Sequence, residues 1–149
     1  MKSLFNVSEN KEIIGRINSL SPESKGEWGK MNVSQMLTHV QAPLKVAFGE
    51  LTLKRSFAGF LFGKIAKKKL SSDRQWNKGM PTDKNFVVTG SRNFDEEKGR
   101  LIVLVRRFTE SGPSGISKQA HPFFGTLTVD EWDRLMWNHL DHHLRQFGV

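Results

Sequence analysis

Apolar side chains recur every three or four residues along most of this chain, which is the period of an α-helix. The pattern predicts helices over residues 10–20, from residues 32–34 onward, over residues 93–108, and from residue 128 to the C-terminal end. A Phe-rich segment at residues 54–70 also has helical character, although two glycines weaken the pattern there. We therefore expect four main helices and one shorter helix.

Polar residues at the starts of these segments support the prediction. Thr128 and Glu131 have the spacing of a capping box, which marks the start of the last helix. Asn32 or Ser34 can cap the second helix in the same way. Pro43 falls inside the apolar pattern of that second helix, so we expect a kink or an early break near it.

One apolar run is ambiguous. The stretch "LIVLVRRF" at residues 101–108 fits a buried strand as well as a helix, because short apolar runs do not separate the two. The acidic lead-in "FDEEKGR" favours a helix start, since carboxylates are stabilised at helix N-termini. Residues 71–91 have the composition of a loop. The fold class that we expect is an all-α bundle.

Length and composition limit the number of domains and the kinds of site that this chain can form. A chain of 149 residues fits one domain, spanning residues 1–149, with a single hydrophobic core. The absence of cysteine excludes disulfides, thiolate metal sites and a cysteine nucleophile. No stretch has the apolar length of a signal peptide or a membrane span, so we expect a cytoplasmic protein.

The net charge of +8 raises the question of nucleic acid. Much of the excess lies in residues 54–74, which contain "KIAKKKL". Without a recognition motif, a solvated lysine-rich helix end explains this segment better than nucleic-acid binding does. The aromatic residues beside the lysines leave a membrane-surface segment as a third interpretation.

The C-terminal stretch "NHLDHHLRQFGV" holds three of the five histidines. His139 and His143 are four residues apart, so on a helix they differ by only about 40° and share one face. Such a pair is a common way for one helix to supply two metal ligands. A third ligand can come from His39, on the second helix, or from His121, in the loop "QAHPFFG". Hydrogen-bonded core histidines and histidines at a helix C-terminus are the alternatives.

These residues carry a family resemblance. A histidine in the second helix, in "WGKMNVSQMLTHV", followed by "HxxHHxxQ" on the last helix, resembles the DinB/YfiT-like superfamily of metalloenzymes. The stretch "HPFFGTLTVDEWDRLMWNHLDHHLRQFG" is similar to one bacterial branch of that superfamily. The likeness covers most of the chain and is most specific in the last block. The ending "HLRQ" departs from the commoner "HRGQ", which leaves the substrate contacts open.

The resemblance implies a four-helix bundle with an unusual crossover topology. It also implies a divalent metal, nickel or zinc, on His39, His139 and His143. Some relatives transfer small thiol cofactors to electrophiles or hydrolyse such adducts, so a low-molecular-weight thiol is one candidate substrate. A homodimer is compatible with the resemblance.

Our leading hypothesis is a metal-dependent transferase or hydrolase that acts on a small molecule. His121, His142 and Gln146 are the candidate catalytic residues beside the metal, whereas Asp141 lies about 200° from His139 and should face away. One alternative is a non-catalytic bundle whose metal stabilises the fold or senses the metal. Another is a binding module that uses the basic segment at residues 54–74.

Overall fold

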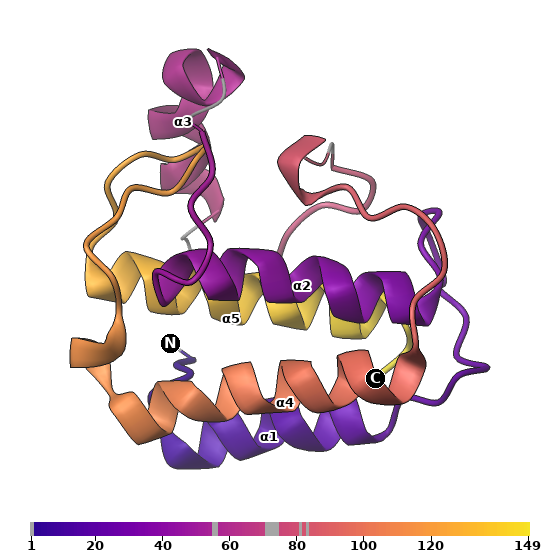
Figure 1. Cartoon of the computed structure of the whole chain (residues 1–149). Coiled ribbons are helices and arrows are strands. Elements are labelled where there is room, and N and C mark those ends of the chain that lie inside the picture. Colours follow the sequence, from indigo (N-terminus) through magenta and orange to yellow (C-terminus); the bar gives the residue numbers. More distant parts are fainter. Residues whose placement is uncertain (1, 55–56, 71–74, 81, 83) are drawn as a thin grey trace.

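The computed structural model describes residues 2–54, 57–70, 75–80, 82 and 84–149 (Figure 1). These residues form helices and contain no β-strand, apart from one isolated bridge between His121 and Gly125. The helices in chain order are α1 (Val7–Asn18), α2 (Val33–Ala47), α3 (Phe57–Leu70), η1 (Lys84–Phe86), α4 (Phe94–Ser111), η2 (Pro113–Gly115) and α5 (Val129–Gln146). The prediction of an all-helical fold is confirmed for this part of the chain, and the ambiguous run at residues 101–108 is helical.

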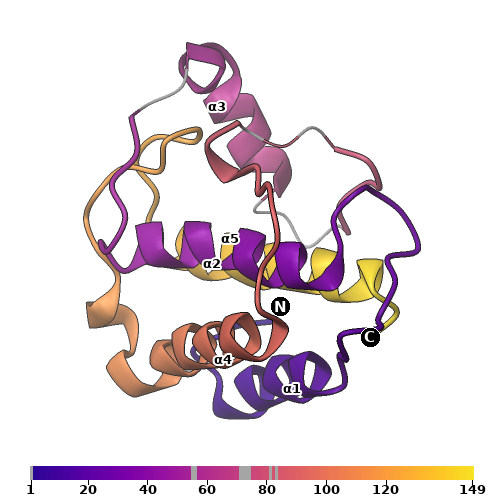
Figure 2. The ribbon, with the colours of Figure 1, turned by 45° about the vertical axis from the view of Figure 1, so that its right-hand side comes forward.

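Four of the helices form the body of the molecule in two layers. Figure 1 shows α2 beside α5 in one layer and α4 beside α1 in the other. Both α4 and α5 pack against α1 and α2, so α1 and α2 lie on a diagonal although they are consecutive in the chain. Helices α1 and α5 run in one direction, and α2 and α4 run in the opposite direction (Figures 1 and 2). The parallel pair α2 and α4 therefore needs a long connection, which carries α3 and η1.

Side-chain caps fix the starts of these helices. Asn32 and Gln35 form a capping box at the start of α2, and Thr128 and Glu131 form another at the start of α5. The Asn93 side chain accepts a hydrogen bond from a backbone N–H in the first turn of α4. The capping box predicted for the last helix is confirmed, and Asn32 rather than Ser34 caps the second.

The predicted early break at Pro43 is wrong. Helix α2 continues through Pro43 to Ala47. Pro43 has no N–H for the carbonyl of His39, and an interior proline costs a helix about 3 kcal/mol. Leu44 and Val46, which follow it, are fully buried, and each such burial contributes roughly 1.5–3 kcal/mol. The apolar contacts beyond Pro43 therefore outweigh the lost hydrogen bond.

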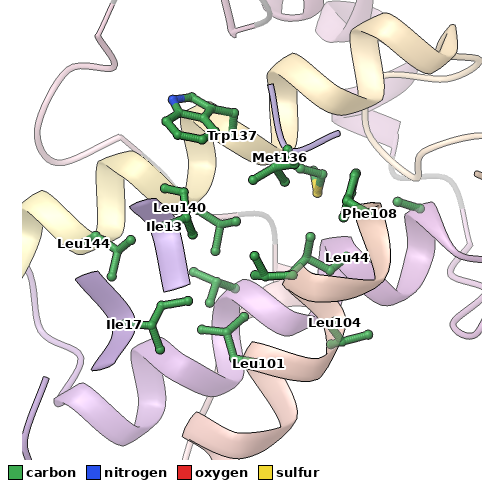
Figure 3. Close-up of a cluster of buried hydrophobic side chains, with 14 of the residues drawn as sticks. Ile13, Ile17, Leu44, Leu101, Leu104, Phe108, Met136, Trp137, Leu140 and Leu144 are labelled. Carbon is green, nitrogen blue, oxygen red and sulfur yellow. The ribbon is translucent and has the colours of Figure 1, made fainter. Parts of the chain in front are cut away.

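The core lies between the two layers. Figure 3 shows side chains from all four bundle helices meeting there. The predicted apolar faces of the first, second, fourth and last helices are buried in this core, which includes Ile13, Ile17, Leu44, Leu101, Leu104, Phe108, Met136, Trp137, Leu140 and Leu144. Among the described residues, no helix has the length and apolar character that a membrane span requires.

Helix α3 stands outside the bundle, beyond the α2–α5 layer (Figures 1 and 2). Its Gly63 is buried, and a Cβ atom there would collide with the backbone oxygen of Phe123. The Lys67 Nζ also forms an ion pair with Glu131 on α5 at 2.9 Å. Gly63, one of the two glycines that weakened the helical pattern, thus lets the loop before α5 approach α3 closely. Part of the basic segment, residues 55–56 and 71–74, lies outside the described residues.

Candidate metal centre

Three histidines meet where α2 and α5 face each other. His39 comes from α2, and His139 and His143 come from successive turns of α5. Each offers a ring nitrogen within 4.8 Å of the nitrogens of the other two. The closest pair is Nε2 of His39 and Nε2 of His139, at 3.0 Å. The three ring centroids are 4.7–4.9 Å apart.

The packing of the two helices explains why these side chains converge. On α2, His39 lies between the buried residues Met36 and Val40, so the stripe that enters the core also carries the imidazole. On α5, His139 and His143 lie next to the buried Leu140 and are four residues apart. Because α2 and α5 pack against each other, the three rings are directed into one space.

Hydrogen bonds fix which ring nitrogens carry protons. The Nδ1 of His39 is 2.8 Å from the backbone oxygen of Phe86, and the Nδ1 of His143 is 2.7 Å from Oε1 of Gln146. Both oxygens can only accept, so both Nδ1 atoms donate and each Nε2 is left unprotonated, with a lone pair that can accept a proton donor or bind a metal.

The side chain of Gln146 is itself oriented by a second contact. Its Nε2 donates to the backbone oxygen of Trp28, which settles which end of the amide faces His143. Gly29 makes room for this amide: its φ is +84°, and a Cβ atom there would clash with Nε2 of Gln146. The loop before α2 is thereby connected to the orientation of the His143 ring.

All three imidazoles are held in the neutral form. Burial, with a smaller contribution from the nearby His39, lowers the pKa of His143 to about 3. Burial also lowers the pKa of His39, against the opposing effect of its bond to Phe86. The pKa of His139 lies well below its usual range, because its ring is desolvated and the other histidines lie close to it. Neutral imidazole is the form that binds a metal.

The donor set fits a divalent transition metal. Two imidazole nitrogens at 3.0 Å must share a proton or a cation, because two bare lone pairs repel each other. Two nitrogens on a tetrahedral zinc ion would be about 3.3 Å apart, given Zn–N bonds of about 2.0–2.1 Å. Within the described part of the chain, this is the one group of three histidine or acidic side chains close enough to hold an ion.

A cavity of about 170 Å³ opens beside the three histidines. Its walls are mostly apolar and come from α2, α5, the loop before α5 and the long connection between α2 and α4. Apart from the three histidines, the lining consists of Pro43, Trp76, Met80, Thr82, Phe86, His121, Phe123, Phe124, Leu135, Met136 and His142.

His142, a predicted candidate catalytic residue, flanks the three histidines. Its ring lies 5.0 Å from the His143 ring and between Trp28 and Trp76, at 5.8 and 5.9 Å. The Nδ1 of His142 is buried and has no hydrogen-bond partner among the described residues.

His121 also lines the cavity, in contact with Phe124 at a ring distance of 4.6 Å. Its Nδ1 accepts hydrogen bonds from the backbone N–H groups of Phe123 and Phe124. The proton of neutral His121 must then be on Nε2, so this ring can donate but not accept a proton there. A catalytic role for His121 remains a prediction, and this tautomer argues against a role as proton acceptor.

Asp141 and two backbone oxygens complete the description of the surroundings of the site. Asp141 faces away from the three histidines, as predicted, and pairs with Arg16 and Arg145 at 2.9 and 2.8 Å. Sequence reasoning missed the backbone oxygens of Phe86 and Trp28, which orient the site. A backbone carbonyl has no signature in the residue pattern, and Phe86 lies 47 positions from its partner.

Comparison with known proteins adds one finding. Neither the search of curated proteins nor that of solved structures gave a match. A family profile described as "Protein of unknown function (DUF1569)" matches residues 2–148. Because this match covers nearly the whole sequence, the chain belongs to the DUF1569 family.

Proposed function

We propose that His39, His139 and His143 bind one divalent transition metal, and that a small molecule reacts beside it in the adjoining cavity. The observation that carries the proposal is the convergence of three neutral imidazoles, with ring nitrogens within 4.8 Å of one another, on a cavity wall. Nickel and zinc are the expected metals, because both accept imidazole nitrogen readily.

A divalent ion on three neutral imidazoles keeps its positive charge and open positions, and it can lower the pKa of a bound water or thiol toward neutrality. The protein's own residues prepare the site for such a ligand. Phe86 and Gln146 hold two rings in the tautomer that presents Nε2. The apolar walls limit the access of water, and the ring of His142 is part of the cavity lining.

The reaction that we propose is transfer to, or hydrolysis at, an electrophilic centre, with a low-molecular-weight thiol as one candidate substrate. The resemblance to the DinB/YfiT-like superfamily supports this choice of chemistry. The long crossover between the parallel helices α2 and α4 is compatible with the crossover topology that this resemblance implies.

The proposal is tested with protein purified without an affinity tag, stripped with a chelator and reloaded with zinc or nickel. Two model reactions separate the chemistries: conjugation of a thiol to 1-chloro-2,4-dinitrobenzene, and hydrolysis of 4-nitrophenyl acetate. We expect at least one rate to depend on added metal and to disappear in His139→Ala. Thr89→Lys, in an exposed loop that does not line the cavity, serves as the control. Rates that chelation and His139→Ala leave unchanged would rule out metal-dependent chemistry.

A stabilising role is the second candidate, because the three ligands join α2 to α5. A metal present at a thousand times its Kd would stabilise the fold by about 4 kcal/mol. Zinc that raises the Tm of the parent protein, but not of His139→Ala, while both model reactions stay at background, would favour this role.

A further inference from the structure

We propose that the cavity beside the three histidines selects an uncharged, ring-sized apolar group, attached directly to the atom that faces the histidines. This inference rests on the proposed function for the identity of the reacting atom, but the preference of the cavity can be measured without metal. The preference distinguishes such ligands from thiols that carry several carboxylates.

The first observation is the charge of the walls. Among the described residues that line the cavity, none carries a carboxylate, an ammonium or a guanidinium group. The ionisable groups of the lining are histidine rings. Apart from the proposed metal itself, a carboxylate that entered this space would meet no charged partner in the lining and would lose its hydration, which disfavours binding.

The second observation is the volume. The cavity measures about 170 Å³, and an apolar cavity of about 150 Å³ is large enough to bind benzene. One six-membered ring with a short substituent therefore fits. A tripeptide-sized thiol would have to leave most of its atoms outside.

The third observation is the placement of aromatic rings. Trp76 lies 5.7 Å from the His139 ring, directly beside the proposed ligands. Phe124 and Phe86, which also line the cavity, pack around His121 with ring distances of 4.6 and 5.8 Å. A planar ring in this cavity would meet aromatic faces and edges, which is the contact geometry that aromatic groups prefer.

The charge preference is tested first on chelator-treated protein. The matched probes are 4-methylbenzyl alcohol and 4-methylbenzoate, followed by tryptophan fluorescence and by ligand-observed NMR. We expect the neutral probe to bind roughly tenfold or more tightly than the anion, because the anion would be buried without a partner. Equal or tighter binding of 4-methylbenzoate would overturn the proposal.

Two variants assign the preference to this cavity. Thr82 is exposed and lines the cavity, so Thr82→Lys adds a cation without disturbing the core. This variant should narrow or reverse the preference, whereas Thr89→Lys, which adds the same charge outside the cavity, should leave it unchanged. Trp76→Ala should weaken the binding of the neutral probe. If all three variants and the parent have the same affinities for the two probes, the probes bind outside this cavity and the proposal is refuted.

A second arm uses zinc-loaded protein, with 4-methylbenzyl mercaptan and 4-(mercaptomethyl)benzoate as probes. Both present the same thiol and differ in charge at the far end of the ring. The neutral thiol should again bind roughly tenfold or more tightly. Protein that retains no zinc would refute the proposed function, yet the metal-free arm would still decide the preference of the cavity. Zinc-loaded protein that prefers the charged thiol would refute the cavity proposal alone.

Discussion

Replacing Gln146 by leucine tests how the metal centre is oriented. The substitution keeps a side chain of similar size but removes two hydrogen bonds of the amide. One is the bond that Oε1 accepts from Nδ1 of His143 at 2.7 Å, and the other is the bond that Nε2 donates to the oxygen of Trp28. His143 then loses the contact that fixes both its tautomer and its ring orientation.

The expected magnitude follows from these contacts. The Nδ1–H of His143 is buried, and a buried donor left without an acceptor costs about 1–3 kcal/mol of folding stability. Loss of a hydrogen-bond partner behind a metal-binding histidine lowers metal affinity by about 10–100-fold. Gln146→Leu should therefore weaken zinc binding by one to two orders of magnitude while the protein still folds.

The assay is competition for zinc against a chromophoric chelator, with thermal unfolding of the metal-free protein measured in parallel. Gln146→Glu is the matched control, because its carboxylate still accepts from His143 but cannot donate to Trp28. It should keep a zinc affinity close to that of the parent, even if it unfolds at a lower temperature. If Gln146→Leu binds zinc as tightly as the parent, the amide does not orient His143, and the argument from tautomers fails.

Two further predictions concern the surroundings of the site. Gly29→Ala should weaken zinc binding and lower the Tm, because the added Cβ would displace the amide of Gln146. The control is Gly112→Ala, which is also at positive φ but has open space around it. It should lower the Tm without changing zinc binding. If Gly29→Ala leaves the zinc affinity of the parent intact, the close contact does not matter. In the metal-free folded protein the pKa of His143 is about 3, below its ordinary value of 6.5. The unfolded chain therefore binds a proton on His143 more readily than the folded protein does. The free energy of unfolding is highest above pH 6.5 and decreases as pH falls toward 3. Denaturant unfolding should show a loss of about 1.4 kcal/mol per pH unit from this group within that window, and the slope should be shallower in His143→Ala. Equal slopes in the two proteins would contradict the assigned pKa.

Much of the bundle could be predicted because its signals are local. Helical periodicity and capping residues such as Asn32 and Thr128 involve residues within one or two turns of each other. They can therefore be read from the sequence alone. The His139–His143 pair is equally local. The facing position of His39 depends on which helices pack together, and the family resemblance rather than periodicity supplied that choice.

The remaining features depend on tertiary contacts. Helix α2 passes through Pro43 because the residues after it are buried, which propensity does not reveal. The backbone oxygens that orient His39 and His143 come from segments far along the chain. The glycines of α3 weakened the helical pattern, yet Gly63 is where the loop before α5 approaches. In each case the physical cause is a neighbour that is absent from the local sequence.

The most direct test of the account is the metal content of the protein, purified without an affinity tag and measured by elemental analysis. The parent should hold about one divalent ion per chain, and His39→Ala, His139→Ala and His143→Ala should each lose it. His121→Ala should retain the ion, because the Nδ1 of His121 is occupied by backbone N–H groups. A parent protein without stoichiometric metal after reloading, or a His39→Ala variant that keeps its full complement, would contradict the three-histidine centre.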